Sequence, residues 1–184
     1  FELTVKNSGV IGIKKNFLKA KKMIVKKNGI KIYEKTDFEG MRKAGKLAAE
    51  CLDYLTPFVK VGVSTGELDD LCRDFITAHG AIPACLGYHG YPKTLCISIN
   101  HVICHGIPDY ERKLADGDIL NIDVTVILDG WFGDTSRMYY AGKPKLKGTR
   151  LCEVTYECLM RGIDVVLPGA HFGDIGAVIE EYAH

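Results

Sequence analysis

Residues 119–140 read ILNIDVTVILDGWFGDTSRMYY and carry the clearest structural signal in the chain. Two runs rich in β-branched and aromatic residues flank Asp129-Gly130, and an Asp-Gly pair between such runs is typical of a β-hairpin with a two-residue turn. In that register Thr125 faces Asp134 across the hairpin. We therefore predict two antiparallel strands joined at this turn.

The predicted hairpin brings two aspartates to one face. Side chains two residues apart on a strand share a face, so Asp123 lies beside Thr125, and Asp134 lies opposite Thr125 on the same face. Diagonal neighbours have Cα atoms roughly 7–8 Å apart, and their carboxylates can converge on metal ions about 3.5–4 Å apart. A hydrogen bond to a threonine or to the backbone accounts for one aspartate in an apolar strand, whereas two on one face favour a metal-binding or catalytic role.

Helical patterns precede the hairpin. Thr36 with Glu39, and Ser64 with Glu67, have the spacing of capping boxes, and apolar residues at helical spacing follow each pair. Gly80 is expected to end the second helix. The expected apolar faces are Met41, Ala44, Ala48, Cys51, Leu52 and Leu55 in the first helix and Leu68, Leu71, Cys72, Phe75 and Ile76 in the second.

Further strands and helices are expected on both sides of the hairpin. Alternating side chains predict a strand at residues 95–99 and a second short strand at residues 102–104. After the hairpin helical spacing returns, Pro168-Gly169 ends that helix, and a last helix begins near Gly173. Helices followed by antiparallel strands and then by helices indicate an α+β fold.

Composition places the chain among ordinary globular proteins. It has 184 residues, 47% hydrophobic and 26% charged, with a net charge of +1, which argues against disorder and against a global attraction to nucleic acid or an acidic membrane. No apolar run approaches the roughly 18 residues of a membrane span, and no secretory signal is present. Seven cysteines without a Cys-x-x-Cys motif indicate neither a disulfide framework nor a cysteine zinc site, and free thiols favour the reducing cytoplasm.

Residues 1–35 differ from the rest because they hold ten lysines and only two acidic residues. We expect a lysine-rich extension that is solvated or disordered, with binding to RNA or the ribosome as the alternative. Met23 is the expected natural start, which makes residues 1–22 upstream sequence. Because the chain begins at Phe1 and stops at His184 within a helical pattern, we expect it to be a fragment.

Three histidines have positions that suggest a role. His105 follows the expected strand at residues 102–104, where it could donate a hydrogen bond to a substrate carbonyl or move a proton, or serve a structural purpose only. His89 lies in an aromatic, glycine-bounded loop, for which binding and packing are both open, and His79 is expected to interact with a helix C-terminus. Neighbouring strand residues point to opposite faces, so Cys104 is not expected to pair with His105 as nucleophile and base.

Several ordered motifs closely resemble type I methionine aminopeptidases, which belong to peptidase family M24. They are CLGYHGYPK at 85–93, CISIN at 96–100, VICHGIP at 102–108, DGDILNIDVT at 116–125 and GDTS at 133–136. A weaker likeness covers residues 37–184. The resemblance implies that residues 36–184 are the N-terminal part of a pita-bread (creatinase/aminopeptidase-like) fold, in which two related α/β halves surround two divalent metal ions.

The resemblance also implies a role for each motif residue. Asp123 and Asp134 are metal ligands, in agreement with the predicted hairpin, and His105 is a catalytic residue that contacts the substrate near the scissile bond. Soft sulfur and aromatic edges suit a thioether, and the implied pocket for the N-terminal methionine is formed or bordered by Cys85, Tyr88, His89, Tyr91 and Cys96.

The implied reaction is removal of the initiator methionine from nascent proteins by metal-activated water. Manganese, iron, cobalt and zinc all suit a site of carboxylates and imidazole. The partner is the N-terminal methionine of a nascent polypeptide, with transient ribosome association, no DNA, no membrane and a monomeric state in the cytoplasm.

The chain departs from the family in its remaining ligands. A histidine in a Gly-His-Gly-Ile-Gly motif, two later glutamates and a second catalytic histidine do not occur in these 184 residues. Two carboxylates alone bind metal weakly, so we expect the chain as given to be inactive or nearly so. We also expect exposed apolar edges where further strands of the fold are missing.

Two other kinds of function stay open. One is a non-catalytic pita-bread module that binds peptides or proteins, against which the intact Asp123 and Asp134 argue. The other is a related metallopeptidase that cuts before proline, or a metal-free relative acting on small amidino compounds. The methionine-pocket motifs favour methionine removal over both.

Overall fold

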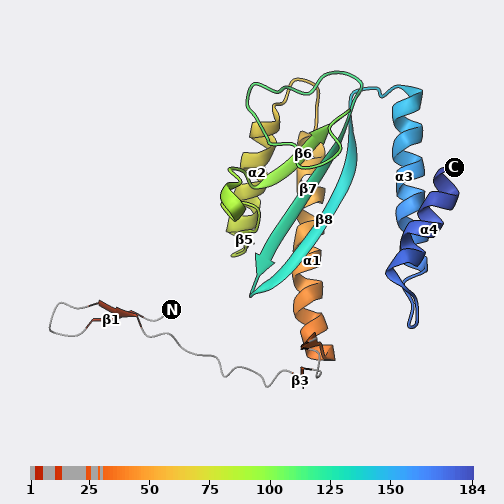
Figure 1. Cartoon of the computed structure of the whole chain (residues 1–184). Helices are drawn as coiled ribbons and strands as arrows, with labels where there is room; N and C mark the ends of the chain where they lie inside the picture. The colour runs from red at the N-terminus through yellow and green to blue at the C-terminus, as the bar shows by residue number, and fades with distance from the viewer. Residues whose placement is uncertain (1–2, 6–10, 14–23, 26–28, 30) are drawn as a thin grey trace. The chain divides into compact units, whose positions relative to one another are not determined.

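The computed structural model of this chain describes residues 3–5, 11–13, 24–25, 29 and 31–184. The chain divides into two compact units, residues 1–38 and residues 39–184. In the first unit two short antiparallel pairs form, made by β1 (Leu3–Val5) with β2 (Ile11–Ile13) and by β3 (Ile24–Val25) with β4 (Lys31–Ile32) (Figure 1). The expectations of disorder and of a start at Met23 concern a segment that lies largely outside the described residues and stay predictions.

The second unit is built on an antiparallel sheet with one long strand at its centre. This strand, β7 (Asp118–Leu128), pairs along its whole length with β8 (Trp131–Ala141). Its other edge pairs with β6 (Leu95–Ile99) and β5 (Ile82–Pro83). The sheet is therefore assembled around the hairpin that the sequence predicts.

The hairpin has the predicted turn and register. Thr125 is the partner of Asp134, and the connection consists of Asp129 and Gly130 alone. Both turn residues have positive φ, 51° and 83°, as a type I′ turn requires at its two central positions. The turn chemistry thus fixes which side chains of the two strands share a face.

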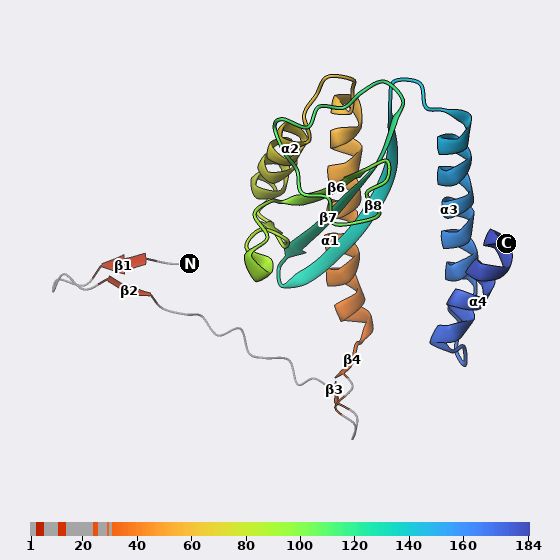
Figure 2. The same cartoon turned by 45° about the horizontal axis from the view of Figure 1, so that its top comes forward.

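Two helices cover one face of the sheet (Figures 1 and 2). Helix α1 (Lys35–Leu55) and helix α2 (Thr65–Ala78) pack against alternate, fully buried residues of β7, namely Leu120, Ile122, Val124 and Val126. Gly133 of β8 lies so near α1 that an added Cβ atom would be 2.1 Å from the carbonyl oxygen of Ala44. This face is the core, and the opposite face carries the odd-numbered side chains of β7.

The two helix starts differ in how well the sequence predicts them. The capping box of Ser64 and Glu67 is present at the start of α2, and His79 Nδ1 lies 2.8 Å from the Phe75 carbonyl oxygen at its end, as predicted. The predicted start of α1 is two residues too late. The helix begins at Lys35, and the Asp37 carboxylate accepts the backbone N–H of Glu34 at 2.8 Å.

The prediction that Met41 of α1 belongs to the core is also wrong. Met41 is 48% exposed, whereas Leu47, which was not predicted, is buried. The other five predicted apolar residues of this helix are buried. The apolar face of α1 therefore starts one turn later than its sequence pattern suggests.

The remaining elements lie before and after the hairpin. Short 3₁₀ turns occur at Thr56–Phe58 and Tyr88–Gly90, and the predicted final helices are α3 (Leu146–Asp164) and α4 (Phe172–Ala183). The strand predicted at residues 102–104 is wrong, since these residues form an irregular loop.

Helix α3 places part of its apolar side in solvent. Leu151, Leu159 and Ile163, three of the residues at helical spacing, are each more than half exposed. The start of the helix approaches the sheet, where an added Cβ at Gly148 would meet Ile119 at 3.1 Å. An apolar surface is thus left open along α3.

Candidate active site

One cavity collects all eight residues proposed for the site. It has a volume of about 620 Å³ and lies on the face of the sheet that α1 and α2 leave open. The residues that line it are Cys85, Tyr88, His89, Gly90, Tyr91, Pro92, Cys96, His105, Ile107, Asp123, Thr125 and Asp134. These residues are up to 49 positions apart in sequence. They come together because strand β6, the loop before it, the loop after it and the hairpin meet here.

Two carboxylates lie at the strand side of this cavity. Asp123 belongs to β7 and is directly opposite Ser136, so Asp134 on β8 is its diagonal neighbour on the same face. The hydroxyl of Thr125 donates a hydrogen bond to Asp134 Oδ1 at 3.2 Å. The arrangement predicted from the turn at residues 129–130 is therefore present.

The surroundings of Asp123 favour a positive charge close to the two carboxylates. Burial raises the pKa of the Asp123 carboxyl, the negative charge of Asp134 raises it further, and His105 acts in the opposite direction. Two carboxylates that disfavour each other's ionised form are stabilised by a cation, and hard divalent ions prefer carboxylate oxygens. The donor set therefore fits a divalent metal.

Two aspartates alone do not complete a divalent metal site of the usual kind. Within the part of the chain that the structure describes, no group of three or more His, Cys, Asp or Glu side chains is arranged to hold a metal ion. Most divalent sites use at least three protein ligands or complete their shell with water and substrate. The expectation that Asp123 and Asp134 are two ligands of a larger site stays a prediction.

His105 reaches the same cavity from a loop rather than from the end of a strand. Its backbone has φ 57°, and the next residue, Gly106, lies against β6, where its N–H donates to Ser98 Oγ at 3.1 Å and its carbonyl accepts from the Ile97 N–H at 2.8 Å. An added Cβ at Gly106 would be 2.1 Å from the Ile97 carbonyl oxygen. Only glycine allows the loop to approach β6 so closely and so place His105.

Cys104 and His105 are not neighbouring strand residues, because the strand predicted at residues 102–104 is absent. The structure separates the two residues in another way, because His105 lines the cavity and Cys104 is an exposed residue that does not line it.

The other wall of the cavity is made of sulfur and aromatic side chains. The loop before β6 turns at Gly87, His89 and Gly90, all with positive φ, and presents Tyr88 and Tyr91. Burial raises the pKa of the Cys85 and Cys96 thiols, which keeps both neutral and unsuited to nucleophilic attack. Neutral thiols and aromatic rings form a soft, weakly polar wall that accommodates an apolar or thioether side chain.

Four lining residues were not among the predicted site residues, namely Gly90, Pro92, Ile107 and Thr125. Thr125, which binds Asp134, could have been identified, since the predicted register already places the two opposite each other. Ile107 has no such signal, because its position depends on how the loop after His105 folds back on β6.

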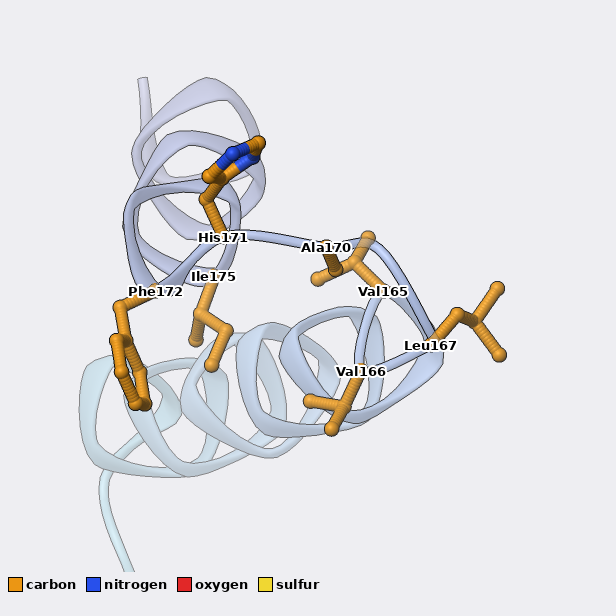
Figure 3. Close-up of a pocket in the computed structure, with 7 residues that line it drawn as sticks. All are labelled: Val165, Val166, Leu167, Ala170, His171, Phe172 and Ile175. Carbon is orange, nitrogen blue, oxygen red and sulfur yellow. The ribbon is translucent and has the colours of Figure 1, made fainter. Parts of the chain in front are cut away.

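A second hollow lies at the connection between α3 and α4 (Figure 3). Its volume is about 510 Å³ and its lining is Val165, Val166, Leu167, Ala170, His171, Phe172 and Ile175. The lining is apolar except for His171, and none of the residues predicted for the site is there. The lining therefore contains one histidine and no carboxylate or thiol.

Comparisons with known proteins agree with the geometry. Residues 39–184 match the model of metallopeptidase family M24. A methionine aminopeptidase of Rickettsia prowazekii (strain Madrid E) is 61% identical over 154 residues, which are 84% of this chain and 59% of that protein. A methionine aminopeptidase of Salmonella typhimurium is 57% identical over 155 residues, 84% of this chain and 59% of that protein.

The fold is also similar to a solved structure. The crystal structure of methionine aminopeptidase from Rickettsia prowazekii superposes with a TM-score of 0.82 at 61% sequence identity, over 84% of this chain and 62% of that chain. This chain therefore spans about three-fifths of the length of the relatives that it matches.

Proposed function

This chain belongs to metallopeptidase family M24 and carries part of the pita-bread fold, and we propose that the whole protein removes N-terminal methionine from polypeptides by hydrolysis. The observation that carries the proposal is one cavity in which two facing carboxylates, a histidine and a sulfur-aromatic wall come together. The carboxylates suit metal chemistry, and the wall suits the side chain of methionine.

Asp123 and Asp134 would each hold a divalent cation, and the proposal includes two such ions. Bound divalent ions supply Lewis acidity, which polarises a peptide carbonyl and lowers the pKa of water. The open strand face keeps both carboxylates accessible from the cavity, and the hydroxyl of Thr125 fixes the orientation of Asp134. Manganese, iron, cobalt and zinc are all compatible with these oxygen ligands and with imidazole.

His105 would donate a hydrogen bond to the carbonyl oxygen of the first peptide bond. Its loop is fixed against β6 through Gly106, and it shares the cavity with both aspartates. A fixed N–H donor stabilises the negative charge that develops on a carbonyl oxygen during attack, without reorganisation at the moment of reaction.

The methionine side chain would occupy the wall made by Cys85, Tyr88, His89, Tyr91 and Cys96. The Tyr91 hydroxyl donates to the Leu95 carbonyl oxygen at 2.8 Å, so this group faces the backbone and leaves its ring to the cavity. Burial raises the pKa of Tyr91, which keeps the hydroxyl a donor. The wall thus offers a thioether no charged group.

The proposal extends to the setting of the reaction. We place it in the cytoplasm, on nascent polypeptides, with a transient ribosome contact and a monomeric enzyme. Seven free cysteines support a reducing compartment. Separately, none of the helices in the described part of the chain is both long and apolar enough to cross a membrane.

The test uses the full-length protein supplied with a divalent metal. We expect it to release methionine from a Met-Ala-Ser peptide and to leave an Ala-Pro peptide uncut, and Asp134→Ala should abolish the release. Asp74→Ala is the control, since Asp74 is exposed on α2 and its carboxylate lies 3.6 Å from Arg73 Nε. Wild-type activity in the Asp134 variant would refute the proposal, as would a folded full-length protein without stoichiometric metal.

A further inference from the structure

We propose that Asp69 is a positioning residue that sets the shape of the methionine pocket from behind, by fixing the start of strand β6. The proposal rests on the proposed function, and it concerns a residue that lines neither of the two cavities described above. Asp69 lies on the buried side of α2, and the joint that it holds connects the pocket loop to the sheet.

Asp69 is a buried carboxylate with an unusual task. It is only 2% exposed, and its Oδ1 atom accepts the backbone N–H of Thr94 at 2.9 Å and of Leu95 at 2.8 Å. Burial raises the pKa of this carboxyl, while the two backbone hydrogen bonds act in the opposite direction. Burial of a carboxylate costs free energy, which the two backbone hydrogen bonds offset. These hydrogen bonds also fix the backbone at Thr94 and Leu95, where β6 begins.

Leu95 transmits this restraint to the pocket. Its N–H is held by Asp69, and its carbonyl oxygen accepts the hydroxyl of Tyr91, a residue of the pocket wall. The next residue, Cys96, lines the same wall and is paired across the sheet with Asp123. A shift of Leu95 therefore moves both Tyr91 and Cys96, and with them the width of the pocket.

A purely structural role for Asp69 makes a different prediction. If the carboxylate only stabilised the fold, its loss would lower the melting temperature and the fraction of active protein, with substrate selectivity unchanged. If it positions the pocket wall, folded protein without it should bind the methionine side chain poorly and should discriminate less against side chains of other shapes.

The experiment compares Asp69→Ala, Asp69→Asn and Asp70→Ala in the metal-loaded full-length protein. For Asp69→Ala we expect KM for Met-Ala-Ser to rise about tenfold and selectivity for methionine over leucine and norleucine to fall about tenfold, with kcat changed less than about threefold. Asp69→Asn keeps an acceptor oxygen in place and should stay within about twofold of the wild type in each constant.

Asp70→Ala is the matched control. Asp70 is the next residue on α2, carries the same charge, and instead binds the Tyr110 hydroxyl at 2.6 Å on the surface. This variant should keep the wild-type KM and selectivity. Selectivity in folded Asp69→Ala equal to that of the wild type would overturn the proposal, and so would a loss of selectivity in Asp69→Asn as large as in Asp69→Ala.

A second readout does not depend on peptidase activity. Cys96 is a buried residue, 8% exposed, whereas Cys104 is exposed and serves as an internal reference. Alkylation of Cys96 relative to Cys104 should be faster in Asp69→Ala than in Asp69→Asn or the wild type. Should the alanine variant fail to fold, Asp69→Glu replaces it, because its extra methylene displaces the carboxylate and should produce the same change.

The two proposals fail in distinguishable ways. An inactive wild type refutes methionine removal and leaves the alkylation test intact. An active wild type with unchanged Cys96 alkylation in Asp69→Ala, or in Asp69→Glu where that variant replaces it, refutes the positioning role and leaves methionine removal intact.

Discussion

The two faces of strand β7 differ in burial and in polarity. One face places Leu120, Ile122 and Val124 against helices α1 and α2 with almost no exposed surface. The other face, offset by one residue, carries Asp123 and Thr125 into an open cavity. The same strand therefore contributes to a closed core on one face and to an acidic cavity on the opposite face. The hairpin register decides which side chains face the cavity.

The largest expected effect lies on the open face. Replacing Asp123 or Asp134 by alanine in the full-length protein should lower kcat/KM for methionine release by about a thousandfold or more, because each change removes a proposed metal ligand. The folded state should lose little stability, since the two carboxylates repel each other in the absence of a cation. Peptide assays and thermal melting of the same samples measure both effects.

A smaller change sharpens the comparison from the closed face. Gly133→Ala introduces a Cβ atom 2.1 Å from the Ala44 carbonyl oxygen, so α1 and β8 must separate, and we expect a loss of about 1–3 kcal/mol in the free energy of unfolding. Gly45→Ala is the matched control, because an added Cβ there meets no atom within 4 Å. Denaturant unfolding should show this second variant unchanged or stabilised by about 0.5–1 kcal/mol, and a destabilised Gly45 variant together with a neutral Gly133 variant would show that the packing is misassigned.

The third expected effect is smaller again and concerns the open face of β7. Thr125→Val keeps the shape of the strand but removes the hydroxyl that donates to Asp134. We expect about a tenfold loss in metal affinity or in kcat/KM, as is typical when a partner of a metal ligand is lost. Metal titration monitored by activity is the measurement, and unchanged affinity would mean that Asp134 needs no such orientation.

How much of this contrast the sequence could predict depends on how local its cause is. The hairpin, its register and the shared face of Asp123 and Asp134 follow from the Asp129-Gly130 turn and the two-residue period of a strand. The start of α2 after Ser64 has an equally local cause, because its two capping residues are three positions apart.

The failures have non-local causes. The irregular path of residues 102–104 depends on Gly106 lying against β6, and the apolar valine and isoleucine there resemble a strand only when read alone. The buried role of Asp69 depends on amides 25 and 26 residues further along the chain. Local patterns cannot report such contacts, since they form only after the elements pack.

The smallest expected effect concerns pH. Burial raises the pKa of Asp69 in the folded state above its ordinary value, so its ionised form is disfavoured by folding. The unfolded state then binds fewer protons than the folded state between the two pKa values, and this group lowers stability as the pH rises through that window. Asp69→Asn should therefore be at least as stable as the wild type at neutral pH, and this difference should shrink in acid, as paired melting curves at several pH values would show.

The most direct test of the account is anomalous X-ray diffraction from crystals of the full-length protein grown with manganese. We predict anomalous peaks within coordination distance of the carboxylates of Asp123 and Asp134, in the cavity that His105 also lines. Peaks located elsewhere, or two carboxylates that project from opposite faces of the hairpin, would contradict it.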